Sequence, residues 1–194
     1  MSNRRIPDLP AKMLDDEQRD LYQRITNGPR ASGRQYFAIT APDGRLRGPF
    51  SAMLLDPPIG SAVEQLGTAL RFRGVLPARC RELVILTVAA HYRSDFEWQS
   101  HAPIAADLGL QGLDALHAEA TPGGLTPAEN AATTLSRALL GGDVDDDQWP
   151  HIQDALGLAA IFEISVLVGY YSMLALQMRL FRLDGPDGVP PPAA

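Results

Sequence analysis

The chain has 194 residues, of which 45% are hydrophobic and 21% are charged, and its formal net charge is −6. This composition is typical of a soluble globular protein long enough to bury a sizeable core. The acidic balance, with no basic stripe, argues against a nucleic-acid partner. Because Cys80 is the single cysteine, an internal disulfide and a Cys-x-x-Cys redox pair are excluded.

The first 55 residues predict a helix followed by an irregular arm. Residues 13–25, MLDDEQRDLYQRI, form the predicted helix, with Asp15 or Asp16 in its first turn. Residues 28–50 are rich in Gly, Pro and Arg and predict extended loop with a short strand at 35–40, QYFAIT. The N-terminus lacks the apolar core of a secretory signal. We therefore expect a cytoplasmic protein.

From there to the tail the pattern is helical. Helices are predicted at residues 61–73, 76–91, 94–110, 111–120, 125–142, 143–157 and 155–178. Connections are short and strand signals are scarce, so the predicted fold class is all-α. We divide the chain into an arm (residues 1–55), a helical domain (56–182) and a tail (183–194) that its composition predicts to be disordered.

The segment 155–178 is apolar enough to suggest a membrane helix. Glu163 and Gln177 interrupt it, and the uncharged centre between them is shorter than the roughly 20 residues that a span needs. A helix that is apolar nearly all round is otherwise a core or subunit-contact helix. We therefore expect no membrane partner.

Glu82 lies in an apolar stripe of the predicted helix 76–91. It shares one side of the helix with Ile85, Leu86 and Ala89. Burying a carboxylate there is unfavourable unless it is paired, and burial should raise its pKa. A salt bridge to Arg79 or Arg81, a bond to a distant backbone NH and a catalytic role are all compatible with this position.

The stretch FEWQSHAPIA, residues 96–105, places Glu97 and His101 one helical turn apart on an apolar side. Ser94 and Glu97 form the pattern S-x-x-E of a capping box, which would give Glu97 a purely structural role. A capping box does not explain His101. A carboxylate one turn from a histidine can orient the ring and fix its tautomer, as acid–base catalysis requires.

Residues 81–110, RELVILTVAAHYRSDFEWQSHAPIAADLGL, resemble the carboxymuconolactone decarboxylase family, which shares its fold with AhpD-like alkylhydroperoxidases. The resemblance extends over about residues 48–181. It implies an AhpD-like helical domain, here in a longer member with an added arm. It also implies a homo-oligomer, a trimer or hexamer, that buries apolar helices between subunits.

The peroxidase branch of this superfamily has a Glu, a Cys-x-x-Cys pair, and a His four residues after the second Cys. Glu82 and His101 suit this register, and the two cysteine positions fall on Ser94 and Glu97. Thiol peroxidase chemistry needs both thiols. The resemblance therefore implies the fold and the Glu/His pair without the redox activity.

The decarboxylase branch has Glu-x-x-x-His, which matches Glu97 and His101. Its named reaction removes CO2 from a carboxylated muconolactone without a metal or an organic cofactor. The resemblance therefore implies a cofactor-independent lyase for a small carboxylated, unsaturated lactone or related acid. In it, His101 transfers the proton, Glu97 orients His101, and Glu82 completes a buried relay.

Several alternatives remain beside this interpretation. The same residues suit isomerisation of a related substrate, and the fold could also serve as a binding protein without chemistry. Three arginines are candidates to hold a substrate carboxylate: Arg73, Arg79 and Arg93. The acidic run at 143–147 does not fit a calcium loop, and the remaining histidines lack metal-ligand spacing. We expect no metal site.

Overall fold

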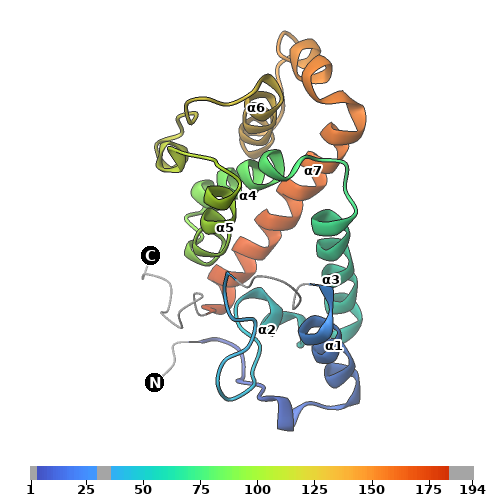
Figure 1. The fold of residues 1–194 in the computed structure, drawn as a ribbon. Helices are drawn as coiled ribbons and strands as arrows, with labels where there is room; N and C mark the ends of the chain where they lie inside the picture. The colour runs from blue at the N-terminus through green and yellow to red at the C-terminus, as the bar shows by residue number, and fades with distance from the viewer. Residues whose placement is uncertain (1–3, 30–35, 184–194) are drawn as a thin grey trace. The chain divides into compact units, whose positions relative to one another are not determined.

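The computed structural model describes residues 4–29 and 36–183, and the regular structure of this part of the chain is helical (Figure 1). The predicted all-α class is confirmed. The elements follow in this order: the 3-10 helix η1 (Ala11–Met13), α1 (Asp16–Asn27), α2 (Pro49–Met53), α3 (Pro57–Phe72), α4 (Ala78–Tyr92), α5 (Asp95–Asp107), the 3-10 helix η3 (Leu113–Ala118), α6 (Pro127–Gly141) and α7 (Trp149–Phe181).

The prediction of a short strand at 35–40 is wrong for residues 36–40, and residue 35 lies outside the described residues. Thr40 and Leu46 form only an isolated antiparallel bridge. The amide of Ala41 bonds to the carbonyl of Arg45 and the amide of Gly44 to that of Ala41, both at 2.9 Å. The amide of Arg47 bonds to the carbonyl of Ile39 at 2.9 Å and completes the bridge, but within the described residues the pairing extends to no second bridge.

The described chain packs as two compact units. One contains the residues before Gly74 together with those from Leu176 onward, and the other is Gly74–Ala175. These units are defined by packing, so the domain boundaries predicted from the sequence stay a prediction. The predicted disorder of the tail concerns residues 183–194, of which 184–194 lie outside the described residues.

In the first unit, α1 and α2 pack against α3. The helix α1 begins with a capping box, in which Asp15 accepts from the Gln18 amide at 2.8 Å and Gln18 accepts from the Asp15 amide at 3.2 Å. Its apolar face buries Leu21 completely. On α3, a Cβ at Gly60 would lie 2.1 Å from the carbonyl oxygen of Met53, so glycine permits the close approach of α2.

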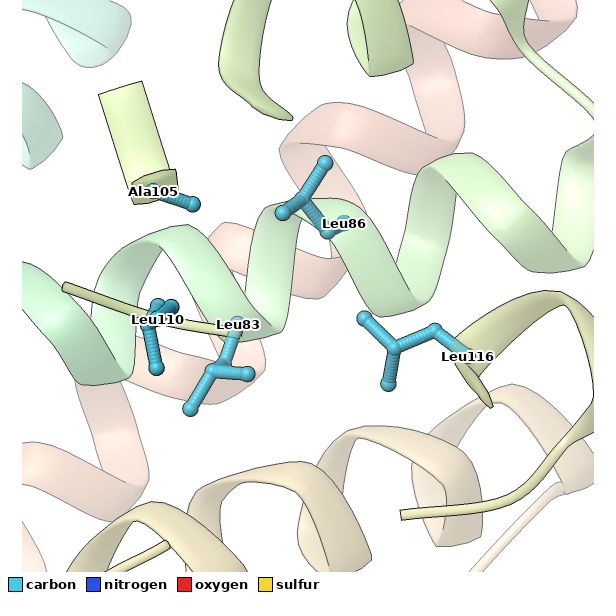
Figure 2. Packing of buried hydrophobic residues seen from close by; sticks show 5 residues of the cluster. All are labelled: Leu83, Leu86, Ala105, Leu110 and Leu116. Carbon is cyan, nitrogen blue, oxygen red and sulfur yellow. The ribbon is translucent and has the colours of Figure 1, made fainter. Parts of the chain in front are cut away.

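The helix α4 is the centre of the second unit and contacts α5, α6 and η3. Every residue from Glu82 to Ala89 is buried, as expected for a helix that is apolar nearly all round. Figure 2 shows the core cluster on one of its sides. The cluster consists of Leu83 and Leu86 from α4, Ala105 from α5, Leu110 from the following loop and Leu116 from η3.

The ends of α5 and α6 follow from local sequence. Gly109, at φ 80°, terminates α5, and the Leu110 amide bonds back to the Ala105 carbonyl at 3.0 Å. The helix predicted at residues 94–110 thus ends close to its predicted boundary. Thr126 and Glu129 form a capping box at the start of α6.

The two helices predicted at 143–157 and 155–178 both lie in the element α7, and non-helical backbone at Gly157 separates them. The element begins only at Trp149, because the amides of Gln148 and Trp149 first close a turn onto the carbonyl of Asp145. Gly157 then kinks it with a φ of 74°, a conformation that glycine adopts readily.

Among the described residues, α7 alone is long and apolar enough to cross a membrane, and half of its most apolar window is buried within the protein. A core helix of a soluble protein meets the same description. Leu158 and Phe162 on α7 are exposed. The expected homo-oligomer, the absence of a membrane partner and the cytoplasmic location all stay predictions.

Glu163 of α7 holds the backbone that leads into α4. Its carboxylate accepts from the Val75 amide at 2.6 Å and the Leu76 amide at 3.0 Å. A Cβ at Gly74 would lie 2.0 Å from the same carboxylate. Glycine is therefore required at residue 74 for this approach.

We predict that Gly74→Ala destabilises the protein by about 1–3 kcal/mol, because the added methyl displaces Glu163 from two amides. Chemical denaturation would measure the change. Gly123→Ala is the matched control, since a Cβ there would meet nothing within 4 Å. Equal stability of Gly74→Ala and the control would contradict the prediction.

Candidate active site

A buried histidine–carboxylate pair joins α4 to α5. The Nδ1 atom of His101 lies 2.7 Å from Oε2 of Glu82. His101 is 6% exposed and Glu82 is 3% exposed, so the pair is shielded from water. Low local dielectric strengthens such a bond and makes either partner alone unfavourable. The structure thus brings together two of the three predicted catalytic residues.

The hydroxyl of Tyr171 on α7 contacts the other ring nitrogen of His101. Its hydroxyl oxygen lies 3.2 Å from Nε2, and the two rings meet edge to face with centroids 5.3 Å apart. When Nδ1–H donates to Glu82 in the neutral ring, Nε2 accepts from the Tyr171 hydroxyl; in the imidazolium, Nε2–H donates to the tyrosine oxygen. Glu82, His101 and Tyr171 therefore form one hydrogen-bonded chain.

Sequence reasoning did not identify Tyr171. It lies 70 residues from His101 in a helix whose apolar pattern predicts only a core or subunit contact. The pair of tyrosines in GYY was the available signal, because a buried tyrosine hydroxyl requires a hydrogen-bond partner.

A further charge stands beside Glu82. The Nε atom of Arg81 is 3.7 Å from Oε1 of Glu82, an ion-pair distance that exceeds a hydrogen bond. The salt bridge and the bond to His101 therefore coexist, and the two roles considered for Glu82 from the sequence are not exclusive.

Arg79 is engaged in a structural contact. Its guanidinium bonds to both oxygens of Glu129 and donates to the Leu108 carbonyl at 2.9 Å. The hydrogen bond from Arg79 holds the pKa of the Glu129 carboxyl below its usual value. This contact ties α4 to α6 and to the end of α5. Arg73 and Arg93 cap α3 and α4 and are exposed, and a role for either in holding a substrate carboxylate stays a prediction.

Glu97 lies deep in the second unit, at 2% exposure. Neither of its oxygens has a hydrogen-bond partner among the described residues, and the same holds for the hydroxyls of Ser94 and Ser100. Burial raises the pKa of Glu97 to about 8, and the neighbouring Ser94 side chain opposes part of this shift. The Glu97 carboxyl is therefore predominantly neutral at pH 7 and able to donate a hydrogen bond.

Two sequence interpretations of Glu97 are corrected by this geometry. The predicted capping box at Ser94 is not formed: Ser94 is the N-cap residue of α5, but its side chain makes no cap bond, and the Glu97 carboxyl is buried. Glu97 also makes no hydrogen bond to His101, whose ring nitrogens contact Glu82 and Tyr171.

Cys80 is buried, and burial raises the pKa of its thiol. A raised pKa lowers the thiolate fraction and hence the nucleophilicity of the sulfur. In the described residues, no group of three His, Cys, Asp or Glu side chains could hold a metal ion.

We predict that Glu97 makes the stability of the protein depend on pH. Between pH 4.5, the ordinary pKa of the side chain, and pH 8 the folded protein retains a proton that the unfolded chain releases. Stability should therefore fall as pH rises through this window, by at most about 1.4 kcal/mol per pH unit. Glu97→Gln stays neutral and should lose this component of the slope.

Urea denaturation at several pH values would measure both slopes. Glu17→Gln is the matched control, because Glu17 is an exposed glutamate in the first turn of α1. It should retain the wild-type profile. Parallel profiles for the wild type and Glu97→Gln would contradict a buried, proton-holding Glu97.

Comparison with known proteins agrees with this fold. Residues 57–138 match the model of the carboxymuconolactone decarboxylase family. No curated protein matches the chain. A crystal structure of a protein of unknown function from Agrobacterium tumefaciens, named as a candidate antioxidant defence protein AhpD, superposes with a TM-score of 0.60 at 18% identity. The superposition covers 68% of this chain and 93% of that one.

The structural likeness establishes the AhpD-like fold alone, and the family match covers residues that include Glu82, Glu97 and His101. The resemblance inferred from the sequence is thereby confirmed: the chain carries a carboxymuconolactone decarboxylase family segment at residues 57–138 within an AhpD-like helical fold.

Proposed function

We propose that the protein is a cofactor-independent decarboxylase for a small carboxylated, unsaturated lactone or related acid. The observation that carries the proposal is the buried Glu82–His101 hydrogen bond at 2.7 Å. A hydrogen-bonded histidine in a dry site is the arrangement that acid–base catalysis uses. The family match supports the same reaction class.

The proposed reaction requires three things of the protein. The bond between carbon and the carboxylate breaks, CO2 leaves, and the electron pair is delocalised over the unsaturated lactone as a dienolate. The site must bind the anion, stabilise the developing oxyanion and return a proton to carbon. A positioned acid–base group accelerates the last of these steps roughly 10²–10⁴-fold.

We assign the orientation of His101 to Glu82, which bonds to Nδ1 and fixes the tautomer of the ring. We assign to Glu97 a role other than the orientation of His101 that the sequence predicted. A carboxyl that burial keeps neutral can donate a hydrogen bond to an oxyanion. We therefore propose that Glu97 stabilises the dienolate oxygen.

A thiol peroxidase function is less well supported. Ser94 and Glu97 occupy the two positions of the cysteine pair in the peroxidase branch, and Cys80, the sole cysteine in the sequence, is buried with a raised thiol pKa. Without an exposed thiolate and a resolving thiol, the peroxide cycle cannot close.

We predict that His101→Ala and Glu82→Gln each lower the rate of CO2 release by roughly 10²–10⁴, because each removes a member of the proton-transferring pair. The assay would follow CO2 and ultraviolet absorbance for a panel of carboxylated lactones and β-keto acids. His151→Ala is the control, since His151 is exposed on α7.

Wild-type rates in folded His101→Ala and Glu82→Gln would refute these roles. The absence of turnover by the wild type across the panel would refute decarboxylation of this substrate class. Isomerisation of a lactone or a binding function would then be the remaining explanations for the site.

A further inference from the structure

Arg81 on α4 has a largely buried side chain whose hydrogen-bond donors are not used. The side chain is 18% exposed, and its Nε atom is enclosed by the protein without a hydrogen-bond partner among the described residues. The nearest carboxylate oxygen, Oε1 of Glu82, lies 3.7 Å away, beyond hydrogen-bond distance. A guanidinium carries five N–H donors, and buried polar groups are in general hydrogen-bonded. Arg81 departs from this rule.

Arg79, two residues earlier on the same helix, makes the contacts that Arg81 lacks. Its side chain is more exposed, at 34%, yet its guanidinium donates to both oxygens of Glu129 and to the Leu108 carbonyl. Arg81 is more deeply buried and makes no such bonds within the described residues. The acceptor for its donors must therefore come from solvent or from a ligand.

The charges around Arg81 favour a carboxylate as that ligand. One oxygen of Glu82 faces Arg81, and the other bonds to His101 at 2.7 Å. When His101 is the imidazolium, two positive charges therefore flank one negative charge. One further anion balances the charges of these three groups, and the planar guanidinium binds carboxylates through two parallel hydrogen bonds.

Arg81 is also the most accessible of the three groups. Its side chain is 18% exposed, against 8% for His101 and 4% for Glu82. The enclosed atom is Nε, which lies nearest to the helix, and the terminal nitrogens are not among the enclosed atoms that lack a partner. These terminal nitrogens are therefore the part of the group that an anion from solvent can reach.

We propose that Arg81 binds the carboxylate of the substrate and thereby places the carbon that loses CO2 beside the Glu82–His101 pair. The identity of the anion as the substrate rests on the proposed decarboxylase function, whereas the anion site itself rests on the contacts of Arg81. The sequence predicted this arginine only as a salt-bridge partner of Glu82.

A purely structural Arg81 would act on Glu82 alone. Its loss would then disturb the Glu82 carboxylate and, through it, the tautomer of His101, and charged and uncharged ligands would be affected alike. An arginine that binds the substrate carboxylate instead distinguishes ligands by their charge, because only an anion accepts charge-assisted hydrogen bonds from it. The two roles are therefore separable by a matched pair of ligands.

We predict that Arg81→Met weakens the binding of a saturated γ-lactone carboxylate roughly 10–100-fold, since hydrogen bonds to a charged group are lost. Binding of the neutral carboxamide of the same lactone should change little. The saturated ring lacks the double bond over which the electron pair would be delocalised, so the probe should bind without reacting. Isothermal titration calorimetry would measure both affinities.

Two further variants make the measurement specific. Arg81→Lys keeps the positive charge beside Glu82 but loses the planar fork, so its affinity for the carboxylate should lie between those of the wild type and Arg81→Met. Arg24→Met is the matched control, because it removes one exposed positive charge on α1. It should bind both ligands as the wild type does.

Each outcome bears on a different claim. Equal binding of the carboxylate by the wild type and folded Arg81→Met would overturn the inference, as would the absence of carboxylate binding by the wild type. Equal losses for the carboxylate and the carboxamide, with a changed His101 tautomer, would make Arg81 a positioning residue and overturn it too. Carboxylate binding that depends on Arg81, in a wild type that releases no CO2, would support the anion site and overturn the proposed function alone.

Discussion

A buried carboxylate bonded to a buried histidine is the constraint around which the second unit is organised. Glu82 and His101 are 3% and 6% exposed, and at this depth either group would be unfavourable without the other as its partner. The bond fixes the relative rotation of α4 and α5, because both side chains must point at one another across the helix contact. Leu83 and Leu86, beside Glu82 on α4, then carry the apolar packing against Ala105 and η3 (Figure 2).

The local features of the fold could be predicted from sequence because their causes are local. The cap of α1 at Asp15, the end of α5 just before Gly109 and the burial of Glu82 within an apolar stripe all depend on residues within one or two turns. The exceptions have physical reasons. The helix predicted from residue 143 begins only at Trp149, because a turn onto the Asp145 carbonyl precedes it, and the strand at residues 36–40 lacks a partner segment beyond one bridge.

The site was predictable in part. The spacing of Glu82 and His101 matches a family pattern, and the structure places the two in contact. Tyr171 could not be found this way, because its contact with His101 depends on how α7 packs against α5. For Glu97 the sequence pattern was misleading, because it predicts an N-terminal cap. In the structure the carboxyl is buried and the Ser94 side chain makes no cap bond. Packing decided between two interpretations that spacing alone could not separate.

The most direct test of the central claim is the tautomer of His101, read from ¹⁵N NMR of histidine-labelled protein across a pH titration, with His101→Ala to assign the signal. We predict that the neutral ring carries its proton on Nδ1, because that nitrogen faces the Glu82 carboxylate at 2.7 Å, and that Glu82→Gln weakens this preference. A neutral ring protonated on Nε2, the form that free histidine favours, with no response to Glu82→Gln, would contradict the Glu82–His101 bond and every role derived from it.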